Sequence, residues 1–300
     1  MKDQADKLRQ IIANLKNRHV PNQVDSEKDI PRRSSRVITV TSGKGGVGKT
    51  NVAVNLAVSL SEYGFKVIIL DADFGLANID VIFGIVPQFT LVDVINNRKN
   101  ILEILTEGPR NLKFISGGSG VEQLAKLDKS QLDKFVENIS LLDKLADYII
   151  IDTGAGVSEN VISFVMAADE VLLVTTPEPT SITDAYALIK MVSNRNKTKP
   201  IKLIVNRAET QTEAENILKK LSLVAEKFLS VKLSPLGYVL NDEVVPKSVR
   251  MQQPFAIAYP KSNAAKHIRD ICKRMVQIRV DRNHGGVKSF VNRLVSFLNN

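Results

Sequence analysis

The sequence predicts an α/β fold: a doubly wound, mostly parallel sheet with helices on both faces. Short, near-continuous apolar runs, several of them rich in β-branched residues, alternate along the chain with stretches whose apolar residues recur at helical spacing. Strands buried on both faces and separated by helices are typical of a covered parallel sheet. The strand candidates are 36–41, 66–71, 112–116, 148–152, 170–175, 201–206 and 235–239.

Domain organisation follows from the breaks in this alternation. Residues 21–33 are polar and contain two prolines, which indicates a linker, placed at 21–35. The core domain is expected over 36–282, because 300 residues suffice for one well-packed α/β domain and hardly for two. Amphipathic helical appendages are expected before and after it, over 1–20 and 283–300.

Composition excludes several classes of protein. The single cysteine, Cys272, cannot form an internal disulfide and leaves no cysteine pair for zinc or an iron–sulfur cluster. No apolar run reaches about 18 residues, so neither a membrane span nor secretion is expected, and a cytoplasmic location fits. The net charge of +9 could serve nucleic acid, anionic lipid, bound phosphates or solubility, and charge alone does not choose among them.

A glycine-rich loop is expected between the first strand and a helix over 50–63, where a phosphate-binding loop belongs. Glycines let successive backbone N–H groups surround phosphate oxygens, the Lys49 ammonium adds positive charge, and the Thr50 hydroxyl suits Mg²⁺. The loop predicts an ATP/ADP and Mg²⁺ site. Its expected binding residues are Gly43, Lys44, Gly45, Gly46, Val47, Gly48, Lys49, Thr50 and Asn51.

Acidic residues follow two of the predicted strands. Asp71 and Asp73 end the second strand and Asp152 ends the strand over 148–152, so all three carboxylates should lie at the C-terminal edge of the sheet, beside the glycine-rich loop. Carboxylates there can hold Mg²⁺ through water or orient an attacking water. The alternative is that the acids only cap strand ends.

The segment from Lys44 to Thr50 resembles the deviant Walker A motif of the MinD/ParA ATPases, because a second lysine stands early in the loop. The resemblance implies that Lys44 reaches the nucleotide of a partner subunit, so that ATP drives homodimerisation. It also implies that Lys44, Lys49 and Asp73 are catalytic, with Asp73 as the switch I aspartate that positions water. Asp71 would support Asp73 or the metal.

The same resemblance assigns the other residues of the nucleotide site. Thr50 and Asp152 would hold Mg²⁺, Asp152 through water, and Gly154 would begin switch II. Asn206 would recognise adenine, since an amide both donates to and accepts from the purine edge. A turn asparagine at a strand end is the alternative for Asn206.

Within that family the chain resembles the flagellar branch, FlhG, also called YlxH or FleN. The motifs shared with it include Asp71 to Asp80, Asp152 to Gly156, Gly117 to Gly120 and the N-terminal heptad from Asp3 to Arg9. The resemblance implies control of flagellar number and placement, with the GTPase FlhF and flagellar C-ring proteins as partners. The residues implied to activate FlhF are Asp3, Gln4, Ala5, Leu8 and Arg9.

A second amphipathic stripe ends the chain. As a helix, residues 287–300 place one apolar sector between Lys288 and Arg293, formed by Val287, Phe290, Val291, Leu294, Val295, Phe297 and Leu298. Fourteen residues rise only about 21 Å, too little to span a bilayer, so we expect the helix to lie in the headgroup plane. This fits the membrane-targeting helix of MinD-like proteins. The alternative is a terminal helix packed on its own domain.

Together these observations predict an ATPase that hydrolyses slowly, dimerises with ATP and binds the inner face of the cell membrane in that state. Division-site placement like that of MinD is one rival function. A DNA-binding partition role like that of ParA, through the basic surface, is another.

Overall fold

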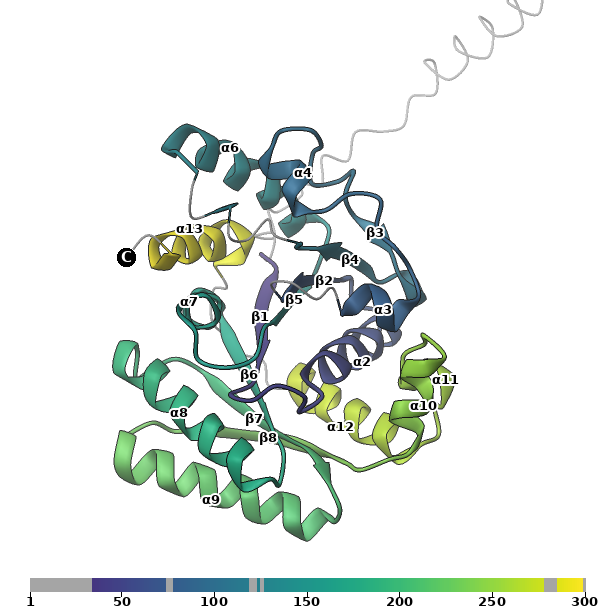
Figure 1. The fold of residues 1–300 in the computed structure, drawn as a ribbon, viewed down its shortest axis with the longest axis vertical. Helices are drawn as coiled ribbons and strands as arrows, with labels where there is room; N and C mark the ends of the chain where they lie inside the picture. Colours follow the sequence, from purple (N-terminus) through teal and green to yellow (C-terminus); the bar gives the residue numbers. More distant parts are fainter. Residues whose placement is uncertain (1–33, 74–77, 119–122, 125–126, 278–284, 299–300) are drawn as a thin grey trace, which may run out of the picture. The chain divides into compact units, whose positions relative to one another are not determined.

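The computed structural model describes residues 34–73, 78–118, 123–124, 127–277 and 285–298 (Figure 1). The N-terminal segment 1–20, with Asp3, Gln4, Ala5, Leu8 and Arg9, lies outside the described residues. So does most of the expected linker. The domain boundaries expected at that end therefore stay predictions.

The described residues form an eight-stranded sheet in the order β3-β4-β2-β5-β1-β6-β7-β8. Neighbouring strands are parallel except for the short β3, which pairs antiparallel with β4. All seven predicted strands are confirmed, and β3 was missed by the sequence reasoning. The strands are β1 (Arg36–Thr41), β2 (Val67–Ala72), β3 (Thr106–Glu107), β4 (Lys113–Ser116), β5 (Tyr148–Thr153), β6 (Glu170–Thr175), β7 (Ile201–Ala208) and β8 (Ser234–Leu240).

Helices cover both faces of this sheet, which confirms the doubly wound class (Figure 1). One apolar layer packs the sheet against α2 (Lys49–Glu62), α3 (Ile79–Phe83), α10 (Val244–Arg250), α11 (Phe255–Ala258) and α12 (Asn263–Gln277). The other packs it against α4 (Leu91–Ile95), α6 (Lys129–Ser140), α7 (Glu159–Ala167), α8 (Pro179–Arg195), α9 (Gln211–Leu229) and α13 (Gly286–Leu298). Two 3₁₀ turns, η1 (Pro109–Asn111) and η2 (Leu141–Lys144), complete the described elements.

The central strand, β1, explains where the glycine-rich loop lies. Val37, Ile38 and Val40 are fully buried, because β5 and β6 flank β1 and helices cover its two faces. Such a strand is held rigidly by its neighbours. The loop that follows it therefore starts from a fixed point at the C-terminal edge of the sheet.

The C-terminal helix α13 packs on the domain in this structure. Its residues Val287, Phe290, Val291, Leu294 and Val295 are at most 5% exposed, and they join the apolar layer that contains α6 and α7. The ring of Phe290 lies 6.1 Å from that of Phe164 on α7. Figure 1 shows α13 beside α7. We call the surface of α6, α7 and η2 that receives the helix the α13 groove.

This placement corresponds to the alternative given for the helix, a terminal helix packed on its own domain. The expected stripe is real, but here it faces protein, because the α13 groove offers it apolar side chains. Phe297 and Leu298, at the end of the stripe, are partly buried. Among the described helices none is both long enough and apolar enough to cross a membrane. Binding of α13 to a membrane surface stays a prediction.

Candidate nucleotide site

The glycine-rich loop joins β1 to α2 and requires glycine at specific points. Gly46 and Gly48 have φ angles of +77° and +86°, in the left-handed region that L side chains rarely adopt. A Cβ at Gly43 would come within 2.3 Å of the Asp184 backbone on α8, so the loop also passes very close to that helix. Since α2 begins at Lys49, its unpaired N–H groups and its dipole point into the loop. The geometry suits a bound phosphate chain.

Lys49 and Asp152 form a buried ion pair next to the loop. The Lys49 Nζ lies 2.7 Å from Asp152 Oδ1, and the side chains are 7% and 0% exposed. Burial raises the pKa of the Asp152 carboxyl, although the Lys49 ammonium and a hydrogen bond from Thr50 oppose this. The second oxygen, Oδ2, is buried and has no hydrogen-bond partner among the described residues. Asp152 and Thr50 therefore fit the prediction that they hold Mg²⁺ between them.

Asp71 organises the chain around switch I. Its Oδ1 accepts a hydrogen bond from the Asp73 N–H at 3.1 Å, and its Oδ2 accepts from Asn78 N–H at 2.9 Å and Ile79 N–H at 3.1 Å. Burial, and then the negative charge of Asp152, raise the pKa of Asp71 to about 6. Both oxygens are thus engaged by backbone on either side of residues 74–77. Of the two roles expected for Asp71, this contact set favours support of Asp73 over direct contact with a metal.

Asp73 lies where switch I approaches switch II. Its Oδ2 accepts a hydrogen bond from the Asn78 side chain at 3.2 Å. Its Oδ1 lies 3.2 Å from the point that a Cβ on Gly154 would occupy, so any side chain at Gly154 would press on the carboxylate. The two switch residues predicted from the sequence are therefore adjacent. The Asp73 carboxylate can accept a hydrogen bond from an attacking water here.

Lys44 is held within its own subunit. Its Nζ lies 2.7 Å from Glu178 Oε2 and 2.8 Å from Thr180 Oγ1, both at the start of α8. The Lys44 side chain is 36% exposed, and its ammonium lowers the pKa of the Glu178 carboxyl. The sequence reasoning missed Glu178 and Thr180. Their position just after β6, at the same edge of the sheet as the loop, was the signal that could have found them.

Asn206, at the end of β7, braces the glycine-rich loop. Its Nδ2 donates to the Val47 carbonyl at 2.8 Å, and a Cβ on Gly48 would lie 2.4 Å from that nitrogen. Asn206 also lines a cavity of about 800 Å³ beside the loop. Its role is thus partly structural, while its second amide N–H and its carbonyl oxygen can hydrogen-bond to a purine base.

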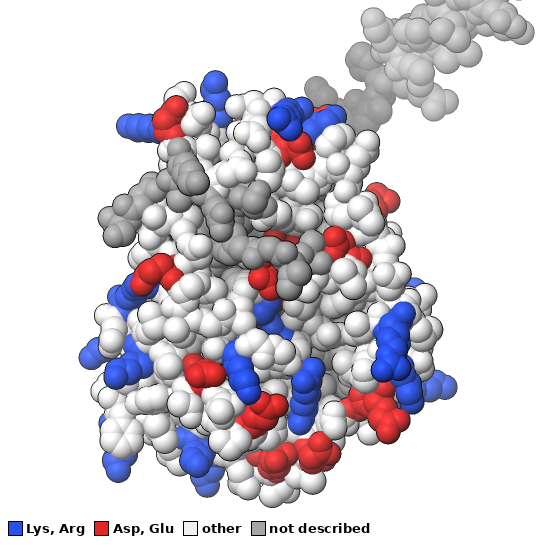
Figure 2. Space-filling model, in the orientation of Figure 1, with Lys and Arg blue, Asp and Glu red and all other residues white. Residues whose placement is uncertain are grey.

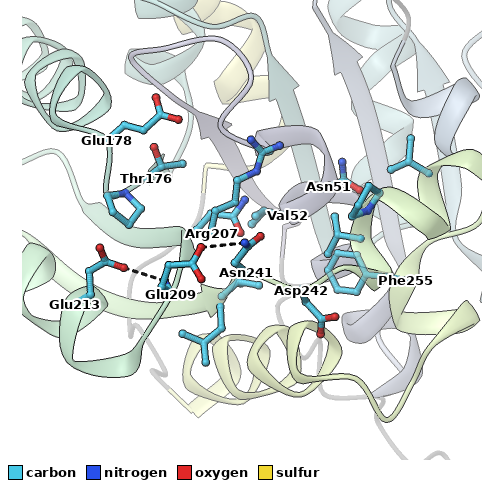
Figure 3. Close-up of a pocket in the computed structure, with 18 of the residues that line it drawn as sticks. Asn51, Val52, Thr176, Glu178, Arg207, Glu209, Glu213, Asn241, Asp242 and Phe255 are labelled. Atoms are coloured by element: carbon cyan, nitrogen blue, oxygen red, sulfur yellow. Dashed lines mark hydrogen bonds between the residues drawn. The ribbon is translucent and has the colours of Figure 1, made fainter.

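The cavity beside Asn206 is large enough for a nucleoside. Figure 3 shows its walls, formed by Asn51 and Val52 of α2, by Glu178 and Arg207, and by Asn241, Asp242 and Phe255. Glu209 accepts a hydrogen bond from the Asn241 side chain at 2.9 Å, which joins the ends of β7 and β8 on its floor. Sequence reasoning assigned none of these except Asn51 to the site, because the contacts that bring α2, α11 and the ends of β6, β7 and β8 together carry no sequence motif.

One crevice therefore gathers the predicted residues of the core domain, at the C-terminal edge of the sheet. They are Lys44, Lys49, Thr50, Asp71, Asp73, Asp152, Gly154 and Asn206. Basic groups, acids and unpaired backbone N–H groups meet there beside a cavity. Such a set can bind a nucleoside polyphosphate and direct water at its terminal phosphate.

Comparison with known proteins identifies the family. A family model of the ParA group, described as an NUBPL iron-transfer P-loop NTPase, matches residues 33–276, most of the chain. The chain belongs to the MinD/ParA family of P-loop ATPases. The sequence expectation for family and activity is thereby confirmed.

Individual relatives of this MinD/ParA ATPase match most of its length. It is 40% identical to the antiactivator FleN of Pseudomonas aeruginosa over 87% of this chain and 93% of FleN. It is 35% identical to the flagellum site-determining protein YlxH of Helicobacter pylori over 99% of this chain and all of YlxH. MinD in the Aquifex aeolicus MinC:MinD complex superposes with a TM-score of 0.65 at 28% identity, covering 84% of this chain and all of MinD.

Proposed function

We propose that this ATPase is an ATP-dependent dimerising switch that regulates the number and placement of flagella. The antiactivator FleN matches 87% of the chain, and YlxH, a flagellum site-determining protein by name, matches 99% of it. That alignment extends beyond the ATPase domain and so includes the segment with the Asp3-to-Arg9 heptad. The heptad supports the further proposal that this segment stimulates the partner GTPase FlhF. Flagellar C-ring proteins are proposed as the targets of placement.

ATP and Mg²⁺ are proposed as the ligands of the crevice. The phosphates would lie on the N-terminus of α2, and Thr50 with the unpaired Oδ2 of Asp152 would hold Mg²⁺. Magnesium supplies charge neutralisation for the triphosphate. When phosphates enter, Lys49 can turn from Asp152 to them, because a polyphosphate offers it more negative charge. Asp73 then orients water for slow hydrolysis.

Dimerisation is proposed to depend on Lys44, and the partly exposed position of this lysine at the nucleotide crevice is the observation that carries the proposal. The Lys44 side chain is 36% exposed, and the described residues that hold its ammonium, Glu178 and Thr180, both lie at the α8 N-terminus, so the ammonium can leave them. The triphosphate of a facing subunit is a stronger attractor than one exposed carboxylate, since two apposed triphosphates repel unless cations bridge them. Glu178 therefore binds Lys44 while the subunit is a monomer.

Membrane binding is proposed to require release of α13 from the α13 groove. The helix combines an apolar face with the flanking cations Lys288 and Arg293, which suits an anionic surface. One such helix binds a bilayer weakly, but two on one dimer bind together through their high effective concentration. The ATP dimer would then be peripheral at the inner face of the cell membrane.

Sizing of the wild type and Asp73→Ala with ATP and with ADP tests the switch. We expect a dimer with ATP that persists in Asp73→Ala, because that variant cannot position water, and a monomer in Lys44→Ala. Monomers in every sample would refute the two-subunit site. Salt-sensitive retention on non-specific DNA with ATP would favour a ParA-like role instead. Figure 2 gives that role little support on the face it shows, where Lys and Arg are interspersed with Asp and Glu.

The iron transfer named in the family description is not proposed for this chain. Its single cysteine, Cys272, is buried, and burial raises the pKa of its thiol to about 12. Iron–sulfur carriers bind their cargo through cysteine thiolates, which this chain cannot provide in pairs.

A further inference from the structure

Two carboxylates connect α13 to the start of the first strand. Asp143, in η2, accepts hydrogen bonds from the Val287 N–H of α13, at 3.0 Å to Oδ1 and 3.1 Å to Oδ2. The same Oδ1 accepts from the Ser35 N–H at 3.1 Å. One side chain thus holds the N-terminus of the last described helix and the residue before β1.

Asp169 repeats this arrangement on the other side of β1. Its Oδ1 lies 3.1 Å from the Arg293 guanidinium of α13, and its Oδ2 accepts from the Val37 N–H at 3.0 Å. Arg293 also donates to the Ala167 carbonyl at 2.7 Å, at the end of α7. The helix is therefore held by two carboxylates. Asp143 also accepts a hydrogen bond from Ser35 and Asp169 one from Val37, the residues on either side of Arg36.

The two ties lie at the edge of the sheet opposite the nucleotide crevice. Asp143 precedes β5 and Asp169 precedes β6, and these are the two strands that flank β1. Because the three strands are parallel, their N-terminal ends meet at one edge. Residues 34–37 consequently lie between the two carboxylates, at the point where the N-terminal segment enters the domain.

The junction is also sterically tight. Gly286 has a φ angle of +66°, and a Cβ there would lie 2.7 Å from both carboxylate oxygens of Asp143 and 2.9 Å from the Ser34 Cβ. The first residue of α13 therefore packs directly against the chain before β1. Contact this close gives the two segments little freedom to move independently while α13 is docked.

We propose that docking of α13 fixes the entry of the N-terminal segment, so that release of α13 loosens residues 34–37. When α13 leaves, Asp143 loses the Val287 donor and Asp169 loses the Arg293 charge, and both carboxylates gain water and rotamer freedom in place of fixed partners. The Ser35 and Val37 N–H groups then lose well-ordered acceptors. The docking state of α13 is thereby transmitted to residues 34–37.

The use of this coupling rests on the proposed function. If α13 binds the membrane and the N-terminal segment activates a partner GTPase, the coupling loosens residues 34–37, the attachment point of that segment, in the membrane-bound state. Activation would then be confined to the membrane surface. The coupling itself is a property of the single chain and can be measured without lipid or partner.

Hydrogen exchange of the full-length protein, read by mass spectrometry, tests the coupling. Arg293→Ala removes a contact of α13 and touches neither Ser35 nor Val37. We expect exchange at those two amides to rise about tenfold or more, together with faster exchange in α13. Lys288→Ala is the matched control, because it removes an exposed cation of the same helix, and it should change neither. Exchange in α9, which packs on α8, β7 and β8, should stay constant in both variants.

A second variant forces release of the helix. Phe290→Asp places a charge at a site that is 3% exposed, so α13 cannot remain docked. Faster exchange within α13 with unchanged exchange at Ser35 and Val37, in either variant, would overturn the proposal. Coupling between two sites is reciprocal, so Ser35→Pro, which removes the N–H donor, should accelerate exchange in α13. If α13 exchange stays unchanged in Ser35→Pro, the proposal also fails.

This design separates the coupling from the membrane role. Unchanged exchange at residues 35 and 37 with intact vesicle binding would remove the coupling alone. Coupled exchange without any vesicle binding would remove the membrane role alone.

Discussion

The ring contact between Phe164 and Phe290 provides a direct test of whether the α13 groove controls membrane binding. Phe164→Ala changes the groove and leaves every residue of α13 intact, so the lipid affinity of the released helix is preserved. Phe164 is 1% exposed and Phe290 3%, with ring centroids 6.1 Å apart. Truncating a buried phenylalanine to alanine costs about 3–5 kcal/mol.

That cost shifts the docking equilibrium of α13, because local release relieves the cavity left in the groove. Since about 1.4 kcal/mol is a tenfold change in an equilibrium constant, the full cost would favour release by roughly two to nearly four powers of ten. If α13 is released before the domain unfolds, the measured loss in the free energy of global unfolding is smaller than the full cost, because the released state no longer contains the cavity. We expect a lower urea midpoint together with binding to anionic vesicles in the absence of nucleotide.

The matched control is Phe114→Ala, on β4. Phe114 is fully buried in the layer on the other face of the sheet, where its ring lies 5.3 Å from that of Phe83. Its truncation should cost a similar amount, about 3–5 kcal/mol, without touching α13. Co-sedimentation with vesicles without ATP should rise for Phe164→Ala and stay at the wild-type level for Phe114→Ala. Equal vesicle binding by the two variants would refute control of membrane binding by the groove.

Three further predictions concern the nucleotide site. Glu178→Gln should lower the ATP concentration at which the dimer forms, measured by light scattering, because Lys44 loses its charged partner. Glu159→Gln alters another exposed ion pair and is the control. Identical dimerisation curves for Glu178→Gln and the wild type would contradict the role of Glu178. Raising the pKa of Asp71 from 3.8 to about 6 means that its ionised form opposes folding, so wild-type stability should fall by roughly 2 kcal/mol relative to Asp71→Asn as pH rises from 4 to 7. A difference in the free energy of unfolding between the wild type and Asp71→Asn that stays constant from pH 4 to 7 would contradict this prediction. Asn206→Ala leaves the Val47 carbonyl without the Asn206 donor. At about 1 kcal/mol per hydrogen bond, we expect roughly fivefold weaker nucleotide binding, measured by calorimetry. An unchanged affinity would exclude the bracing role of Asn206.

The fold could be predicted because its signals are local. Runs such as Arg36–Thr41 and Glu170–Thr175 are short, apolar and bounded by turn residues, and the structure confirms both without a shift in boundary. The strand β3 was missed because two residues, Thr106 and Glu107, carry no periodicity. Its pairing with β4 depends on a contact that only the folded chain creates.

The site could be predicted as far as strand topology reaches. Parallel strands place Asp71 and Asp152 at one edge, and the structure brings them close enough for the charge of Asp152 to raise the pKa of Asp71. Topology does not specify which side chains meet across loops, so the Lys44–Glu178 pair was not foreseen. For α13 the limit is physical, because the same apolar stripe satisfies either a bilayer or the α13 groove.

The ion pair between Lys49 and Asp152 has a consequence for the order of ligand entry. The crevice is already neutral at this point, with the positive charge supplied by the protein itself. A divalent ion arriving alone at Asp152 Oδ2 would meet an ammonium already bound 2.7 Å from Oδ1 of the same carboxylate, and the two positive charges would repel each other. A polyphosphate draws that ammonium away and exposes the carboxylate in the same event. The protein should therefore discriminate against free metal and accept it as a complex with nucleotide, so that cellular magnesium does not occupy the crevice between turnovers.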